Sequence, residues 1–235
     1  MLINCYNRNS AIDSIIRVYN LSWIALCFKI RKVSASFDPD LDPIGIYDPD
    51  HLRIKAKRFD ICWYHATRTW DPNSYTKGIR PLSDVVDEIK CRIENLMRRN
   101  GIKSSVNEAI SQSNSPFAQL YLMKINDHNH GGPYGFLIRS AIFEPSRLGY
   151  HDYLKIPEIV EDVLMCVKSL SGIDLTDQYN FETKKVIIKF KSEYKNDYAL
   201  RNVIGFAYTG NVGMNTFCDN KGIVPESHIL EIDVI

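Results

Sequence analysis

Residues 63–82, WYHATRTWDPNSYTKGIRPL, hold the residue types best suited to binding a small ligand. His65 stands at the end of a strand-like run, where either ring nitrogen can hydrogen-bond a ligand hydroxyl. The backbone beside it can pair with an amide group as a neighbouring strand would. Gly78 follows at a predicted turn. The alternative is an ordinary strand end with a semi-buried histidine and a turn glycine, because short motifs often match by chance.

This stretch resembles the first nicotinamide-dinucleotide-binding motif of the ADP-ribosyltransferase superfamily, in its poly(ADP-ribose) polymerase and diphtheria-toxin branch. That motif reads as a strand, His-Gly-Thr-Arg, a short insert and Gly-Leu. Two positions depart from it, because Ala66 stands at the usual Gly and Ile79 at the usual Leu. About twenty residues are covered by the resemblance.

The resemblance implies a role for each matching residue. His65 would hold the adenosine ribose of NAD, and the backbone at Ala66 would hold the nicotinamide carboxamide. Thr67 and Arg68 would buttress the site, and Gly78 would form the turn that leads into the helix behind it.

The C-terminal segment GIVPESHILEIDVI supplies an acid at the place where this superfamily has its catalytic glutamate. Glu226 stands just before a predicted last strand that also holds Glu231 and Asp233. By resemblance, Glu226 would accept a hydrogen bond from the nicotinamide-ribose 2′-hydroxyl and stabilise the oxocarbenium-like charge. The alternative is a solvated glutamate after Pro225, the usual fate of this residue type.

A pair of tyrosines completes the expected site. In the polymerase-like branch a Gly-x-Tyr strand and a second tyrosine sandwich the nicotinamide by stacking. Tyr134 follows a Gly-Pro turn, and Tyr150 and Tyr153 come after it, so we pair Tyr134 with Tyr150. The gap between them is longer than in that branch.

The order of predicted elements indicates an α+β fold rather than a doubly wound parallel sheet. The resemblance implies an ADP-ribosyltransferase-like split, mostly antiparallel β core with flanking helices. We expect this domain over residues 55–235, with residues 1–54 as an N-terminal extension packed on it. Helical spacing predicts helices at 83–99 and 157–171 and fits a helix at 13–33, although the continuous apolar part of 13–33 could equally be a strand. We expect a loop at 103–116 and strands at 58–67, 120–125, 134–143, 185–191, 203–208 and 228–235.

Composition sets the broad class. Twenty-nine basic and 28 acidic residues give a formal net charge of +1, which does not point to nucleic acid or to an anionic membrane. Six scattered cysteines without a Cys-x-x-Cys motif favour reduced thiols. The apolar run 21–30 is too short to span a bilayer and lacks the features of a signal peptide. We therefore expect a cytoplasmic protein without a membrane partner.

Other ligand sites are less well supported. His128 and His130, with Asp127 and His151, would bind zinc only if a turn-like stretch held them in place, so we expect no metal. The Asp-Pro-rich segment 37–50 lacks the spacing of a calcium loop. Cys62 could pair with His65 as a nucleophile, but it lies in the apolar part of the strand and is expected in the core.

The sequence thus predicts an enzyme that uses NAD as a substrate and transfers ADP-ribose to a protein or a nucleic acid. A microbial or phage toxin or defence effector is the expected setting, and an inhibitory partner would fit such an enzyme. Two alternatives stay open. One is an RNA 2′-phosphotransferase-like enzyme, and the other is a non-catalytic module of the same fold that binds a nucleotide or a protein.

Overall fold

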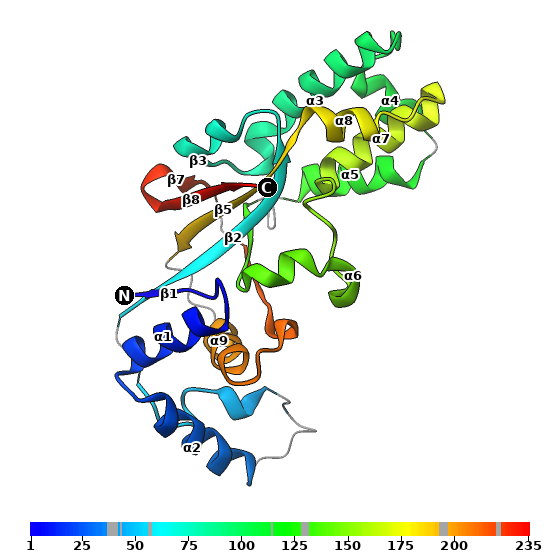
Figure 1. Cartoon of the computed structure of the whole chain (residues 1–235). Coiled ribbons are helices and arrows are strands. Elements are labelled where there is room, and N and C mark those ends of the chain that lie inside the picture. Colours follow the sequence, from blue (N-terminus) through cyan, green and yellow to red (C-terminus); the bar gives the residue numbers. More distant parts are fainter. Residues whose placement is uncertain are drawn as a thin grey trace. The chain divides into compact units, whose positions relative to one another are not determined.

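The computed structural model describes residues 1–36, 42, 44–55, 58–113, 115–127, 132–192, 197–219 and 222–235. Helices and a mainly antiparallel sheet make up these residues (Figure 1), which confirms the α+β class. The chain divides into two compact units, each made of three segments. The first comprises Met1–His65, Tyr134–Gly149 and Lys189–Cys218, and the second comprises Ala66–Pro133, Tyr150–Ile188 and Asp219–Ile235. The domain boundary at residue 55 stays a prediction.

The first unit combines strands and helices from segments that are distant in sequence. The strands are β1 (Leu2–Ile3), the start of β2 (Asp60–Thr69), β4 (Tyr134–Phe136), the end of β5 (Lys184–Ser192) and β6 (Phe217–Asp219). The helices are α1 (Arg8–Tyr19), α2 (Trp23–Ser34), η1 (Gly45–Tyr47), η3 (Arg139–Phe143), α6 (Pro145–Leu148), α9 (Asp197–Thr209) and η4 (Val212–Met214).

The central strand β2 sets the register of the first unit. β1 runs parallel to it with Ile3 opposite Ile61, and β4 runs antiparallel with Tyr64 opposite Phe136. β6 lies beside β4, where the rings of Phe136 and Phe217 meet edge to face at 4.9 Å. Aromatic pairs of this geometry add to the stabilisation that burial alone provides.

Residues 13–33, which could be a helix or in part a strand by sequence, belong to two helices. α1 ends where Asn20 adopts the left-handed conformation with φ 51°, which asparagine tolerates. Ser22 then caps α2 by accepting a hydrogen bond from the amide of Ala25. The two helices meet at 89°. No single helix within the described ranges is long and apolar enough to cross a membrane, although this bent pair has the length and composition to do so.

The second unit is mostly helical. Its strands are the end of β2, β3 (Gly78–Ile79), the start of β5, β7 (Val224–Pro225) and β8 (Ile229–Val234). Its helices are η2 (Pro72–Lys77), α3 (Leu82–Arg99), α4 (Val106–Gln112), α5 (Pro116–Asn126), α7 (Glu158–Ser171), α8 (Thr176–Glu182) and η5 (Glu226–His228).

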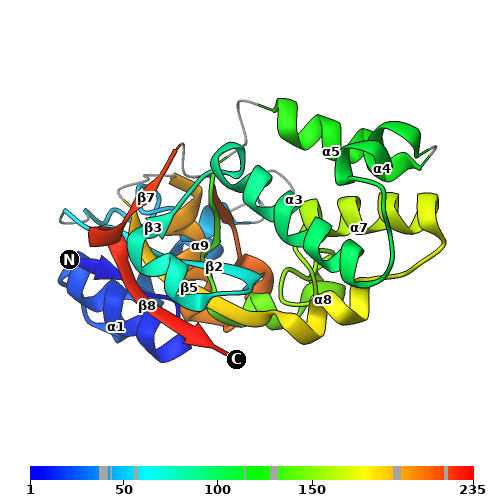
Figure 2. The same cartoon turned by 90° about the horizontal axis from the view of Figure 1, so that it is seen from above.

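Helices α3, α4, α5, α7 and α8 group around one core in this unit (Figure 2). Ile93 of α3, Ala109 of α4 and Val163 of α7 are each fully buried there. Lys124 of α5 joins Asp162 of α7 at 2.6 Å. Burial raises the pKa of Asp162, and the pairing with Lys124 opposes that shift. The predicted helices at 83–99 and 157–171 are confirmed as α3 and α7.

Several predicted elements differ from the structure. The predicted strands at 120–125 and 203–208 are helices α5 and α9, and the predicted loop at 103–116 contains α4, which opens with a capping box of Ser105 and Glu108. Only residues 134–136 of the predicted strand 134–143 are a strand, before η3 begins. The strands predicted at 58–67, 185–191 and 228–235 are confirmed as β2, β5 and β8.

Burial explains the two strands that turned out to be helices. Residues 203–207 of α9 are buried on every side of the helix, so this part of α9 reads as a continuous apolar run. In α5, Ala118 and Tyr121 are buried while Leu120, Leu122 and Met123 are exposed, so apolar residues again surround the helix.

Candidate active-site residues

The His-x-Thr-Arg motif lies on β2, as the sequence predicts. His65 is half-buried, while Ala66, Thr67 and Arg68 are buried. His65 is the last residue of the first unit's segment and Ala66 the first of the second unit's.

In the first unit, His65 is fixed by the backbone of β4. Its Nδ1 lies 2.7 Å from the carbonyl oxygen of Tyr134. A carbonyl can only accept a hydrogen bond, so Nδ1 carries the proton and donates it. Burial lowers the pKa of His65, and the hydrogen bond to Tyr134 opposes this shift. In the neutral ring Nε2 has no proton, so it can only accept a hydrogen bond, such as one from a hydroxyl.

The close approach of β4 to β2 depends on a residue without a side chain. A Cβ added to Gly135 would lie 2.8 Å from Cβ of Trp63 and 2.9 Å from the ring of Phe190. Both distances are shorter than real contacts allow. Glycine at this position therefore lets the Tyr134 carbonyl reach His65.

In the second unit, Arg68 supports the end of β2 through hydrogen bonds of its guanidinium. Its Nε donates to Oγ1 of Thr183 at 2.9 Å, and Nη1 donates to the carbonyl of Leu154 at 3.0 Å. Nη2 donates to the carbonyls of Asn180 at 2.5 Å and Thr183 at 3.0 Å. Burial lowers the pKa of Arg68, and nearby Tyr179 and Asp152 oppose the shift. The guanidinium donors thus join β2 to α8, to its C-cap residue Thr183 and to Leu154.

Thr67 contacts the short helix η2 that follows the motif. Its hydroxyl hydrogen-bonds the phenol of Tyr75, and this bond offsets part of the rise in the pKa of Tyr75 that burial causes. Tyr75 is not among the site residues that the sequence predicts. Nothing in its neighbourhood marks it, because its partner lies on the preceding strand rather than at a motif spacing.

Gly78 pairs with the segment that leads to Glu226. β3 and β7 are antiparallel, with Gly78 opposite Pro225 and Ile79 opposite Val224. Gly78 has φ 105°, a conformation open to glycine. An added Cβ would collide with the carbonyl oxygen of Val224 and lie 3.3 Å from the amide nitrogen of Glu226. The glycine of the first motif and the predicted catalytic acid are therefore neighbours.

Glu226 begins η5 directly after Pro225, and its side chain is exposed. The short helix lies against β3 and η2 and leads into β8. This is the position that the sequence predicts, immediately before the last strand. An exposed carboxylate there can meet a ligand that reaches β3.

The two tyrosines fall in different units. Tyr134 belongs to the first unit, starts β4 and is 38% exposed, and Tyr150 belongs to the second unit and is half-buried. Their pairing around a nicotinamide stays a prediction, as does a contact of the carboxamide with the backbone at Ala66.

The alternative ligand sites gain no support within the described ranges. His128 and His130 lie outside the described residues, as do residues 37–41 and 43 of the Asp-rich segment. Elsewhere in the part of the chain that is described, no three His, Cys, Asp or Glu side chains are placed to hold a metal ion. Asp42 and Asp48 instead pair with Arg201. Cys62 is fully buried, as expected of a core residue.

No model of a protein family matches the chain, and neither the curated proteins nor the solved structures include a significant match to it. The function must therefore be argued from the residues and their geometry.

The Gly78 backbone gives the first testable prediction. Gly78→Ala should lower the free energy of unfolding by about 3 kcal/mol or more, because an L-residue is strained at this φ and its Cβ meets β7. Gly101→Ala is the matched control, since Gly101 has φ 75° but open space around it. That variant should lose only about 1 kcal/mol. Equal losses in urea unfolding would contradict the pairing of β3 with β7.

The pKa of His65 gives the second prediction. Since the folded state lowers this pKa below its ordinary value near 6.5, the unfolded chain binds the proton more readily. Protonation of His65 in the unfolded chain should therefore lower the free energy of unfolding as the pH falls through about 6.5 toward the folded-state pKa. His65→Asn keeps a donor for Tyr134 but cannot take up a proton. Urea unfolding between about pH 7.5 and pH 5 should show a smaller loss of stability in His65→Asn than in the wild type, and parallel curves would refute a lowered pKa.

Proposed function

We propose that this chain is an NAD-dependent ADP-ribosyltransferase. It would cleave the bond between nicotinamide and ribose and transfer ADP-ribose to a protein or a nucleic acid. Glu226 would be the catalytic acid, and His65 would bind the adenosine ribose. Ala66, Thr67, Arg68, Gly78, Tyr134 and Tyr150 would form or support the NAD site.

The observation that carries this proposal is the pairing of Gly78 with Pro225. It brings the glycine of the first motif beside Glu226, although the two lie far apart in sequence. The backbone pairing would set any residue after Pro225 at this place, and here that residue is an exposed carboxylate. Such an arrangement supports the assignment of Glu226 as the catalytic acid.

The proposed chemistry requires a negative charge near a developing positive one. As the nicotinamide leaves, charge develops on the ribose ring, and a carboxylate stabilises it electrostatically. Glu226 is exposed, so a bound ribose 2′-hydroxyl can donate a hydrogen bond to it. The nicotinamide departs as a neutral ring, and the acceptor attacks the ribose carbon and gives up a proton.

His65 suits a role in binding ribose. Its Nδ1–H donates to the carbonyl of Tyr134, so the ring orientation is set before any ligand binds. Burial favours the neutral ring, and a neutral imidazole has an acceptor nitrogen that suits a ribose hydroxyl. The guanidinium of Arg68 hydrogen-bonds Thr183 and Leu154, so it supports the strand and is not free to bind a phosphate. For this reason we favour the ADP-ribosyltransferase over an RNA 2′-phosphotransferase.

The biological setting follows from the reaction class. We infer a cytoplasmic toxin or defence effector, and the six free cysteines fit a reducing compartment. An effector that consumes NAD would need restraint by an inhibitory partner.

Release of nicotinamide from NAD tests the proposal. Glu226→Gln should lower kcat by about 100-fold or more, because it removes the charge with little change in shape. Glu231→Gln in the adjoining strand β8 is the control and should retain wild-type kcat. Equal rates for wild type and Glu226→Gln would refute the catalytic assignment. If the wild type releases no nicotinamide in the presence of protein or RNA acceptors, the proposed enzyme activity is refuted.

A further inference from the structure

Helix α2 exposes apolar side chains on the side that faces away from its own unit. Ile24 is 82% exposed and Phe28 is 69% exposed, and they lie one turn apart on the same side of the helix. The opposite side holds Leu26 and Ile30, which are buried. The helix is therefore already anchored in the first unit, and the exposed pair is not needed to dock it.

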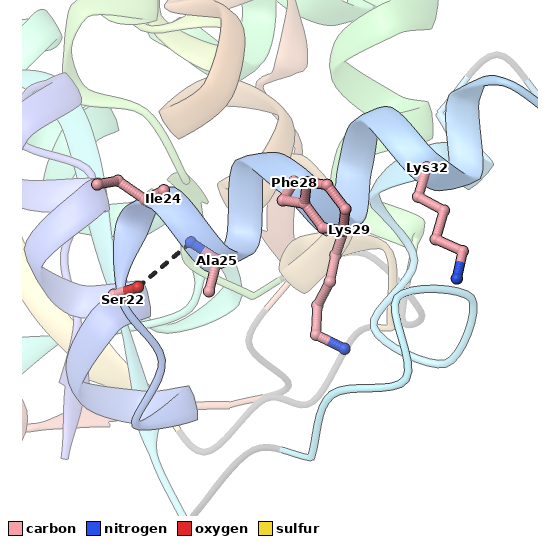
Figure 3. Close-up of a pocket in the computed structure, with 6 residues that line it drawn as sticks. All are labelled: Ser22, Ile24, Ala25, Phe28, Lys29 and Lys32. Atoms are coloured by element: carbon pink, nitrogen blue, oxygen red, sulfur yellow. Dashed lines mark hydrogen bonds between the residues drawn. The ribbon is translucent and has the colours of Figure 1, made fainter.

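Basic residues border this apolar pair. Ser22, Ile24, Ala25, Phe28, Lys29 and Lys32 line a shallow hollow on α2, and Figure 3 shows both lysines extending in the same direction from the helix. Residues 14–36 contain four basic residues and no acid. The hollow thus combines apolar contact with positive charge only.

One of the lysines is held in place. Nζ of Lys29 donates a hydrogen bond to the carbonyl of Leu52 at 3.1 Å. An ammonium has three donors, so Lys29 can still bind an anion while it stays fixed beside Phe28. A charge at a fixed position beside an apolar anchor recognises a partner of defined geometry.

We propose that this hollow is the docking site for an acidic amphipathic helix of a partner protein. Apolar residues one turn apart on that helix would cover Ile24 and Phe28. Carboxylates beside them would pair with Lys29 and Lys32. Helices commonly bind in this way through anchors at i and i+4, and opposite charges fix their orientation. The inference does not depend on the proposed enzyme activity.

An anionic lipid surface is the other chemistry that such a face could meet. Lipid binding grows with buried apolar area, and only two large side chains protrude here. The ammonium fixed to Leu52 would attract a lipid phosphate too, but a fixed position adds most to the recognition of a partner of defined geometry. These observations favour a protein helix.

Two helical peptide libraries test the proposal on the full chain. Both vary the apolar positions at i and i+4, but one carries Glu at the flanking positions and the other carries Lys. Only the Glu library should yield binders by display selection. Phe28→Ser and Ile24→Ser should each weaken the selected peptides by about tenfold or more in fluorescence anisotropy. Lys32→Glu should weaken them as well and admit peptides from the Lys library.

Phe181→Ser is the matched control, because Phe181 of α8 is 91% exposed and lies in the second unit. It should leave peptide binding unchanged, and circular dichroism should show that every variant keeps the wild-type fold. The proposal is overturned if the Glu library yields no binder, or if Phe28→Ser binds as tightly as the wild type. Binding of phosphatidylserine vesicles that is lost in Phe28→Ser, with no peptide selected, would assign the face to lipid instead.

Discussion

The backbone pairing of Gly78 with Pro225 is the constraint on which the second unit's part of the proposed site depends. It needs a residue at φ 105° with no Cβ, because the carbonyl of Val224 occupies that space. Once the pair forms, Glu226 must begin its short helix beside the first motif. The position of an exposed side chain is thus set by backbone geometry rather than by contacts of its own. Arg68 adds rigidity on the same unit by joining β2 to α8 and its C-cap residue Thr183.

The first unit positions its part of the proposed site in a different way. There a side chain is held by a backbone carbonyl, since Tyr134 accepts the Nδ1 proton of His65. Gly135 allows the approach, again because a larger residue would meet Trp63 and Phe190. Both arrangements rely on a glycine at a close backbone contact. Pre-set groups of this kind reduce the cost of ordering a site when its ligand binds.

Sequence patterns predicted a helix with one buried face and strands rich in β-branched and aromatic residues. Helix α3 has a clear apolar stripe, and β2 and β5 have dense β-branched and aromatic runs. The patterns failed where burial surrounds a helix, as for residues 203–207 of α9, because such a run has no helical period. At 13–33 the stripe continued through Asn20, so the turn there was hidden in an otherwise helical pattern.

The site was predictable only in part, for a similar reason. His65, Gly78 and Glu226 could be selected from motif and order, but the sequence holds no sign that Gly78 pairs with Pro225. Pairing between segments so distant depends on the whole fold. Tyr75 could not have been found, because its link to Thr67 crosses from a helix to a strand. Local patterns thus indicate candidate site residues, whereas their contacts depend on the tertiary structure.

The most direct test of the account is calorimetric titration of NAD into the wild-type chain and into His65→Ala. The account predicts saturable binding to the wild type and affinity lowered by about tenfold in the variant, the value of one hydrogen bond to a ribose hydroxyl. Absence of binding to the wild type, or equal affinity of the two proteins, would contradict it.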